Sequence, residues 1–138
     1  MANATRDLGT PGVSDLGYKT VVPIAEGATI FSWTMVSQLP SGYYVPATTE
    51  EAGNVIGVAT HHASDTNRAL RIETDRVFLW RHDGTLTETT LFGSVVFASD
   101  DNNVSASGDI VAGYFYGLHA DGRARVLITG RAALQEVA

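Results

Sequence analysis

From residue 18 onward, the chain is a series of short apolar runs separated by glycine, proline and small polar residues. The runs are rich in β-branched and aromatic residues, which favour strands. No stretch spaces its apolar residues as two turns of an amphipathic helix would require. We therefore predict an all-β fold, either a small β-barrel or β-tulip-like domain or a sandwich. The predicted strands cover residues 20–24, 28–33, 43–46, 55–59, 69–73, 76–81, 114–118 and 125–129.

Two Asp-Gly pairs predict tight hairpins. Asp83-Gly84 follows the run that ends at Arg81, and Asp121-Gly122 separates two apolar runs. Asp-Gly between apolar runs is typical of a two-residue hairpin turn, because its backbone tolerates the positive φ angles that such a turn needs. We expect a hairpin at each pair.

Two parts of the chain resemble each other. Residues 55–72 align without a gap onto residues 111–128, and a glycine-led run precedes each part, at 27–31 and 93–97. This predicts an internal duplication, in which residues 76–90 join the two copies. Two units that close on each other would bury one face of each and leave few free strand edges.

The first twenty residues have a different character. They are small, polar and interrupted by glycine and proline, with neither helical nor alternating periodicity. We predict an extended N-terminal arm over residues 1–20, followed by a single β domain over residues 21–138. The arm is either a frayed terminus or a segment that becomes ordered on binding.

Composition narrows the function. Charged residues make up only 17% of the chain, below the usual quarter, which indicates that a partner covers some of the surface. The net charge of −6 argues against nucleic-acid binding. The chain has no cysteine, and we find neither a signal peptide nor an apolar segment long enough to span a membrane. We expect a protein made in the cytoplasm that does not bind membranes.

The titratable residues do not form a recognisable catalytic or metal-binding motif. Adjacent His61 and His62 would point to opposite faces of a strand, and His82 and His119 precede the two Asp-Gly turns. The acidic run 100–103 lacks the central glycine and closing glutamate of an EF-hand loop. No nucleophile elbow or phosphate-binding loop occurs. We predict a protein that is not an enzyme and needs no metal or cofactor.

Paired aromatic residues are candidates for an interface. Tyr43 and Tyr44 lie beside Pro46, and tyrosine offers a large contact area with a polar tip. The same side chains, with Trp33 or Trp80, would also suit a sugar-binding platform.

The turn and strand pattern carries a family resemblance. Residues 18–129 resemble the small phage head-decoration (cement) proteins, including glycine-rich virion proteins encoded beside major capsid genes. The longer aromatic run at 114–116 departs from that pattern and leaves the strand order open. The features that carry the resemblance are the Val21-Val22-Pro23 strand after a loose arm, Gly57-Val58-Ala59, the strand at 73–78, and the Ser107-Gly108-Asp109 turn before a closing apolar strand.

This resemblance implies a structural virion protein that forms homotrimers at local three-fold sites on the outer capsid surface. Its partners would be the major capsid protein and other copies of itself, and it would stabilise the shell against internal DNA pressure. In that family the N-terminal arm pairs with capsid strands, so we expect capsid contacts within residues 4–22. The expected capsid-binding residues are Leu8, Val13, Leu16, Tyr18, Val21 and Val22.

Two other functions stay open. A tail-tube or connector subunit would form rings or tubes and usually has a long hairpin loop. A carbohydrate-binding β-sandwich would use Tyr43, Tyr44, Trp33 or Trp80 as its platform.

Overall fold

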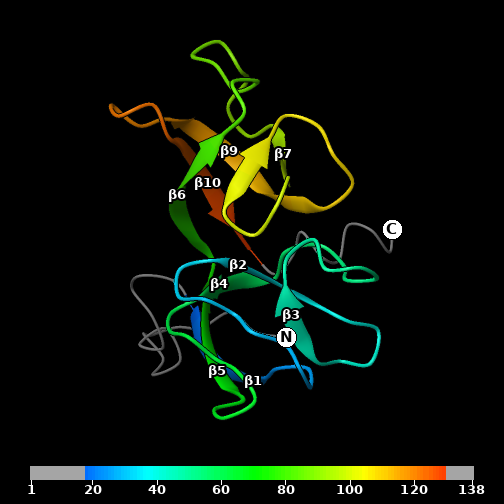
Figure 1. Ribbon diagram of the computed structural model, residues 1–138. Coiled ribbons are helices and arrows are strands. Elements are labelled where there is room, and N and C mark those ends of the chain that lie inside the picture. The colour runs from blue at the N-terminus through cyan, green and yellow to red at the C-terminus, as the bar shows by residue number, and fades with distance from the viewer. Residues whose placement is uncertain (1–17, 130–138) are drawn as a thin grey trace, which may run out of the picture.

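A computed structural model describes residues 18–129, which contain ten strands and no helix. The strands form two units, one above the other in Figure 1. The prediction of an all-β fold is confirmed, and the architecture is a barrel joined to a second sheet.

The N-terminal unit is a five-stranded sheet in the order β1-β5-β4-β2-β3. All its paired neighbours in this order are antiparallel. An isolated parallel bridge from Ile24 to Tyr44 links the two ends of the sheet. The strands are β1 (Tyr18–Pro23), β2 (Met35–Gln38), β3 (Tyr44–Pro46), β4 (Gly57–Ala59) and β5 (Ala69–Thr74).

The C-terminal unit, called the barrel unit below, is a closed five-stranded barrel in the order β10-β6-β8-β7-β9. Its one parallel pair, β6 with β8, closes the barrel at His82 and Val104. The strands are β6 (Arg76–His82), β7 (Val95–Ala98), β8 (Asn103–Ser105), β9 (Val111–Leu118) and β10 (Ala124–Ile128).

The two units have the same topology, which confirms the predicted duplication. Strands β1 to β5 pair with one another as β6 to β10 do, and the Ile24–Tyr44 bridge matches the parallel β6–β8 closure. Val36 pairs with Gly57 in one unit, and Val96 pairs with Gly113 in the other. A Cβ on Gly57 or on Gly113 would collide with a backbone carbonyl oxygen of the next strand. The same close approach is therefore built into both units.

Some details of the predicted duplication are wrong. Residues 76–82 do not join the copies, because they form β6, the first strand of the barrel unit. The alignment slips by two residues after β4 and β9: Ile72 pairs with Ala59, whereas Val126, not Ile128, pairs with Phe115. The connection from Phe115 to Val126 is two residues shorter than the one from Ala59 to Ile72, which accounts for this slip.

Two predicted local elements are also absent from residues 18–129. Residues 28–33 form a turn with one isolated bridge, Ile30 to Ala63, instead of a strand. No hairpin forms at Asp83-Gly84, because β6 pairs with β10 and β8 and the next strand, β7, starts only at Val95. The hairpin at Asp121-Gly122 is confirmed, since it joins paired strands β9 and β10.

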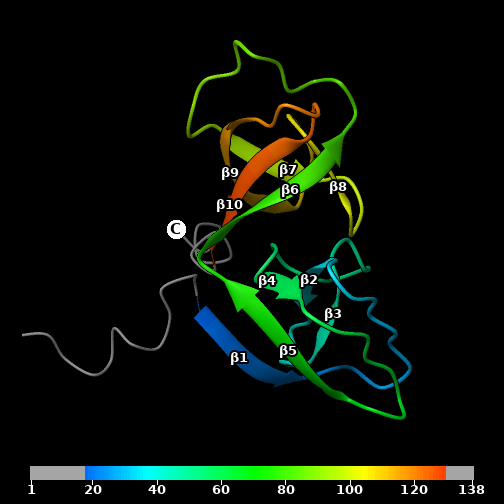
Figure 2. The ribbon, with the colours of Figure 1, turned by 90° about the vertical axis from the view of Figure 1, so that its left-hand side faces the viewer.

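The units meet at a waist around Asp75, which passes the chain from β5 into β6 (Figure 2). The Asp75 backbone N–H donates to the carbonyl of Ile128 at 2.7 Å. Tyr18 pairs with Thr74 and Ile128 with Arg76, so β1 begins and β10 ends at this waist. The predicted arm boundary at residue 20 therefore falls inside β1.

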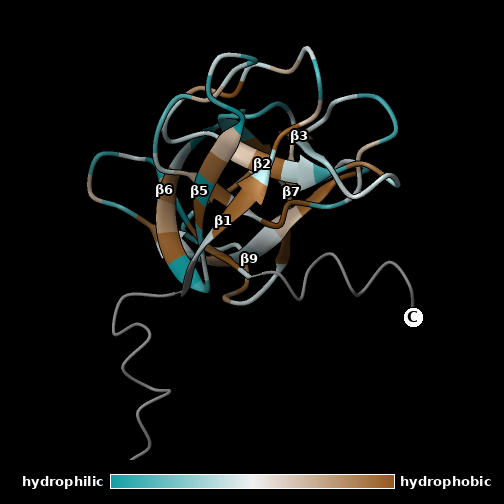
Figure 3. Ribbon diagram, turned by 90° about the horizontal axis from the view of Figure 1, so that it is seen from below, coloured by the Kyte–Doolittle hydropathy of each residue, from teal (hydrophilic) through white to brown (hydrophobic). Residues whose placement is uncertain are grey.

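Apolar side chains form two core clusters, and the hydrophobic colour of the ribbon in Figure 3 lies mainly on the strands. The first fills the N-terminal unit and includes Val22, Val36 and Ile72. The second fills the barrel unit but also contains Met35 and Val58 of the N-terminal unit. Met35 alternates with Val36 along β2, so its side chain lies on the outer face of the N-terminal sheet. The barrel unit therefore packs against that outer face.

Candidate interaction surface

The outer face of the barrel unit carries a row of apolar side chains in cross-strand register. Val77 on β6 pairs with Leu127 on β10. Leu127 pairs in turn with Tyr114 on β9, and Tyr114 with Val95 on β7. Val77 and Val95 are each 37% exposed, and Leu127 and Tyr114 are partly exposed. A rigid sheet therefore presents a continuous apolar strip across four strands.

The turn before β7 extends this strip. Leu91 is 78% exposed and Phe92 is 71% exposed. The Phe92 ring stacks on Tyr116 with a centroid distance of 4.5 Å, and Tyr116 shares the outer side of β9 with Tyr114 by strand alternation. Contiguous exposed apolar surface commonly marks an interaction site. We call these residues the outer apolar face: Val77, Leu91, Phe92, Val95, Tyr114, Tyr116 and Leu127.

The equivalent turn before β2 also projects apolar side chains. Thr34 Oγ1 donates to the carbonyl of Phe31 at 2.8 Å, as Ser94 Oγ donates to the carbonyl of Leu91 at 2.7 Å. Trp33 has a φ of 59° where the barrel unit has a glycine with a φ of 87°. Phe31 and Trp33 are both more than half exposed. A non-glycine residue at this φ is strained, and such strain is common at functional sites.

The predicted capsid-binding residues differ in where they lie. Leu8, Val13 and Leu16 lie outside the residues that the structure describes, and Tyr18 is the first residue of β1. Val21 is 60% exposed and lines a shallow apolar groove with Pro23, Arg68 and Ala69. Val22 is buried in the N-terminal core, so only Val21 of this pair faces solvent.

The two predicted interface tyrosines also differ. Tyr43 is 46% exposed in the loop between β2 and β3. Tyr44 pairs with Gln38 in the sheet and packs against the N-terminal core. The structure therefore leaves Tyr43 as the tyrosine with the larger area available to a partner.

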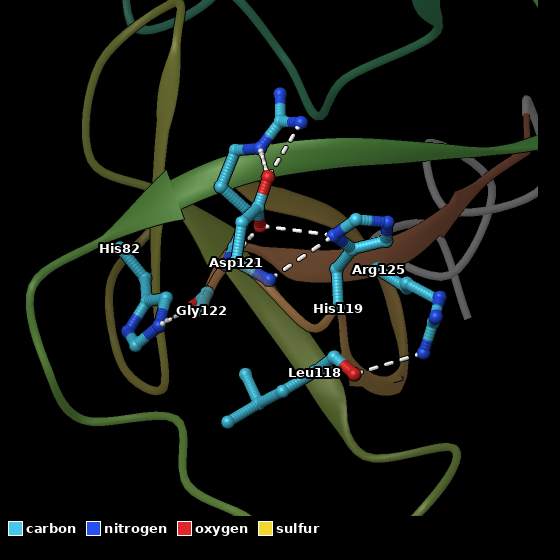
Figure 4. Close-up of polar contacts among 7 residues, drawn as sticks. His82, Leu118, His119, Asp121, Gly122 and Arg125 are labelled. Carbon is cyan, nitrogen blue, oxygen red and sulfur yellow. Dashed lines mark hydrogen bonds and ion pairs between the residues drawn. The ribbon is translucent and has the colours of Figure 1, made fainter.

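Two histidines and an aspartate stabilise the tip of the β9–β10 hairpin (Figure 4). Gly84 N–H donates to His82 Nδ1, so His82 Nε2 carries the proton and donates to the carbonyl of Gly122 at 2.9 Å. Asp121 accepts hydrogen bonds from Arg123 and contacts His119. These bonds, with the Arg123 side chain first, hold the pKa of Asp121 far below its ordinary value. The group is exposed and satisfied within the turn, as turn chemistry predicts.

Two acidic residues in the loops of the barrel unit, Asp83 and Asp101, have shifted pKa values with local causes. Asp83 accepts hydrogen bonds from the Thr85 and Ser105 hydroxyls, which lower its pKa. Burial, followed by the nearby Asp100 charge, raises the pKa of Asp101. Between residues 18 and 129, no group of three or more His, Cys, Asp or Glu side chains could hold a metal ion.

No family model matches the chain, and neither the curated proteins nor the solved structures include a match. Residues 18–129 contain no helix that is long and apolar enough to cross a membrane.

Proposed function

We propose that this protein is a structural virion protein that binds the outer surface of a phage capsid. It would stabilise the shell against internal DNA pressure as homotrimers at local three-fold sites, with the major capsid protein as its partner. Many weak contacts repeated over a closed lattice give an avidity that one contact cannot. The resemblance in turn and strand pattern supports this proposal.

The edge of β1 is the observation that carries the proposal. Among the described residues, β1 forms its strand ladder with β5 alone, and its parallel bridge to β3 lies just past the strand at Ile24, so residues 18–23 have no ladder partner on the other edge. Val21 projects from this strand with 60% of its surface exposed. Residues 1–17, the greater part of the predicted arm, join the chain directly at the start of β1. A segment predicted to be extended and a strand edge without a ladder partner are what strand addition to a capsid subunit requires.

Truncation tests this proposal, and the structure sets where to cut. Deleting residues 1–17 keeps all of β1, so we expect an unchanged thermal unfolding curve. The truncated protein should no longer co-sediment with expanded capsids assembled from the major capsid protein of the same phage. A Val21→Thr variant keeps the β-branched shape and should reduce capsid occupancy without abolishing it. Unchanged occupancy of the truncated protein would contradict the proposed arm.

A carbohydrate-binding role is the second candidate, favoured by exposed Phe31 and Trp33 on one turn. The Phe31 ring also meets His62 edge to face at 5.3 Å. Aromatic surfaces of this kind suit the apolar face of a sugar ring. Glycan-array binding that is lost on Trp33→Ala but kept on Leu91→Ala would favour this role over the capsid role.

A further inference from the structure

Within one chain, the barrel unit seals the outer face of the N-terminal unit. The Met35 backbone N–H donates to the carbonyl of Asp101, in the loop between β7 and β8, at 2.7 Å. Met35 and its strand partner Val58 have no exposed surface and belong to the barrel unit's core cluster. The contact therefore combines a loop of one unit with the outer sheet face of the other.

The same face of the barrel unit is more exposed. Met35 pairs with Val58 in the N-terminal unit, and the equivalent pair in the barrel unit is Val95 with Tyr114. Val95 is 37% exposed and Tyr114 is partly exposed, whereas both of their counterparts are fully buried. These two residues lie at the centre of the outer apolar face.

The loop that would cover this face is also exposed. The β2–β3 loop is the counterpart of the β7–β8 loop and has the same length, so Ser41 stands where the barrel unit has Asp101. Pro40 and Ser41 are exposed, and Tyr43 is 46% exposed. Residues 39–43 carry no charge, which suits contact with an apolar face. The strand pairs that set the equal length are Gln38–Tyr44 and Ala98–Val104.

We infer that the outer apolar face of the barrel unit binds the β2–β3 loop of a second copy of this chain. The occupant follows from the interface already present inside the chain, because the N-terminal unit carries the counterpart of the loop that covers Met35. Each copy then contributes its barrel-unit face to one neighbour and its β2–β3 loop to another, so the contact is head-to-tail. Such contacts close into a ring when the rotation allows it, and the trimer of the proposed function would place six units in one ring. Only that number of copies rests on the proposed function, because the contact itself needs no capsid.

Molar mass in solution tests this contact. By light scattering, the full chain should have a multiple of the 14.7 kDa monomer mass. Val95→Glu places a charge on the face and Ser41→Glu places one on the loop, so each variant alone should be a monomer. Both positions are at least partly exposed, so we expect urea unfolding midpoints close to that of the unchanged chain. Thr66→Glu, at an exposed position on another loop, should leave the assembly intact.

Mixing the two variants distinguishes a head-to-tail contact from a symmetric one. The Val95→Glu copy keeps an intact loop and the Ser41→Glu copy keeps an intact face, so an equimolar mixture should form dimers and nothing larger. A full chain that stays monomeric at every soluble concentration would overturn the inference. An assembly that resists both substitutions would also overturn it, as would a mixture that stays monomeric. None of these outcomes involves the arm, so the inference and the capsid proposal can fail separately.

Discussion

The two units have the same strand order, but the outer face is buried in one unit and exposed in the other. In the N-terminal unit, Met35 and Val58 are sealed under the barrel unit, whereas their counterparts Val95 and Tyr114 reach the surface. Interior features are retained in both, including the close approach at Gly57 and at Gly113. Duplication has therefore preserved the packing inside each unit, while the outer faces differ according to what covers them.

The largest expected effect comes from the paired glycines. A Cβ at Gly113 would overlap the carbonyl oxygen of Leu127, and one at Gly57 would lie 2.8 Å from that of Glu73. Because a backbone atom cannot move aside cheaply, Gly113→Ala should destabilise the fold by ~3 kcal/mol or more and Gly57→Ala by about 1–3 kcal/mol. Urea unfolding measures both. A larger loss of stability for Gly57→Ala than for Gly113→Ala would contradict this account of the close contacts.

The outer faces should respond unequally to truncation. Met35→Ala removes a fully buried side chain and should cost about 2–5 kcal/mol of unfolding free energy. Val95→Ala, at the equivalent exposed position, should change it by less than about 0.5 kcal/mol when measured on the monomer. The Ser41→Glu background supplies a monomeric reference for both substitutions. Equal costs at the two positions would contradict the difference in burial.

A buried carboxylate distinguishes the outer faces again. Glu73 is 4% exposed and accepts a 2.7 Å hydrogen bond from Arg76, whereas its counterpart in the barrel unit is Leu127. Arg76→Ala would leave that carboxylate without its ion-pair partner and should cost about 1–3 kcal/mol. Glu73→Leu copies the barrel unit and should change the stability by less than about 1 kcal/mol, because the Arg76 side chain remains partly solvated. Equal losses in thermal unfolding would refute this account of the pair.

The smallest effect concerns the two turns. Trp33→Gly relieves a positive φ but adds backbone freedom to the unfolded chain, so the stability should rise by less than about 1 kcal/mol. Gly93→Ala, the matched change in the barrel unit, should lower the stability by a similar amount. Thermal melts of the two variants should therefore shift in opposite directions, and a loss on Trp33→Gly would show that its side chain packs more than its exposure indicates.

Much of the fold could be predicted from the sequence because the residue patterns that favour strands and turns are local. Alternating apolar runs gave the all-β class, and Asp121-Gly122 gave its hairpin. Asp83-Gly84 misled because the residues after it, through Ser94, do not form a strand. The duplication was visible at Gly57 and Gly113, but the shorter connection between β9 and β10 moved the later alignment by two residues.

The interaction surface was harder to predict because it depends on register across strands. Val77, Val95 and Leu127 read as ordinary core residues along the chain, and only the pairing of four strands places them in one outward row. Tyr43 was identified as an interface residue from its side chain alone. Val22 was grouped with the arm, although alternation along β1 buries it while exposing Val21.

Disulfide cross-linking tests the central claim most directly, because the chain contains no cysteine of its own. Within the chain, the Met35–Asp101 backbone hydrogen bond of 2.7 Å places the two residues side by side. If the same contact forms between copies, a mixture of Ser41→Cys and Val95→Cys proteins should oxidise rapidly to a species containing one copy of each. Cross-linking no faster than in a mixture of Thr66→Cys and Val95→Cys would contradict the claim that the uncovered face of the barrel unit receives a second copy.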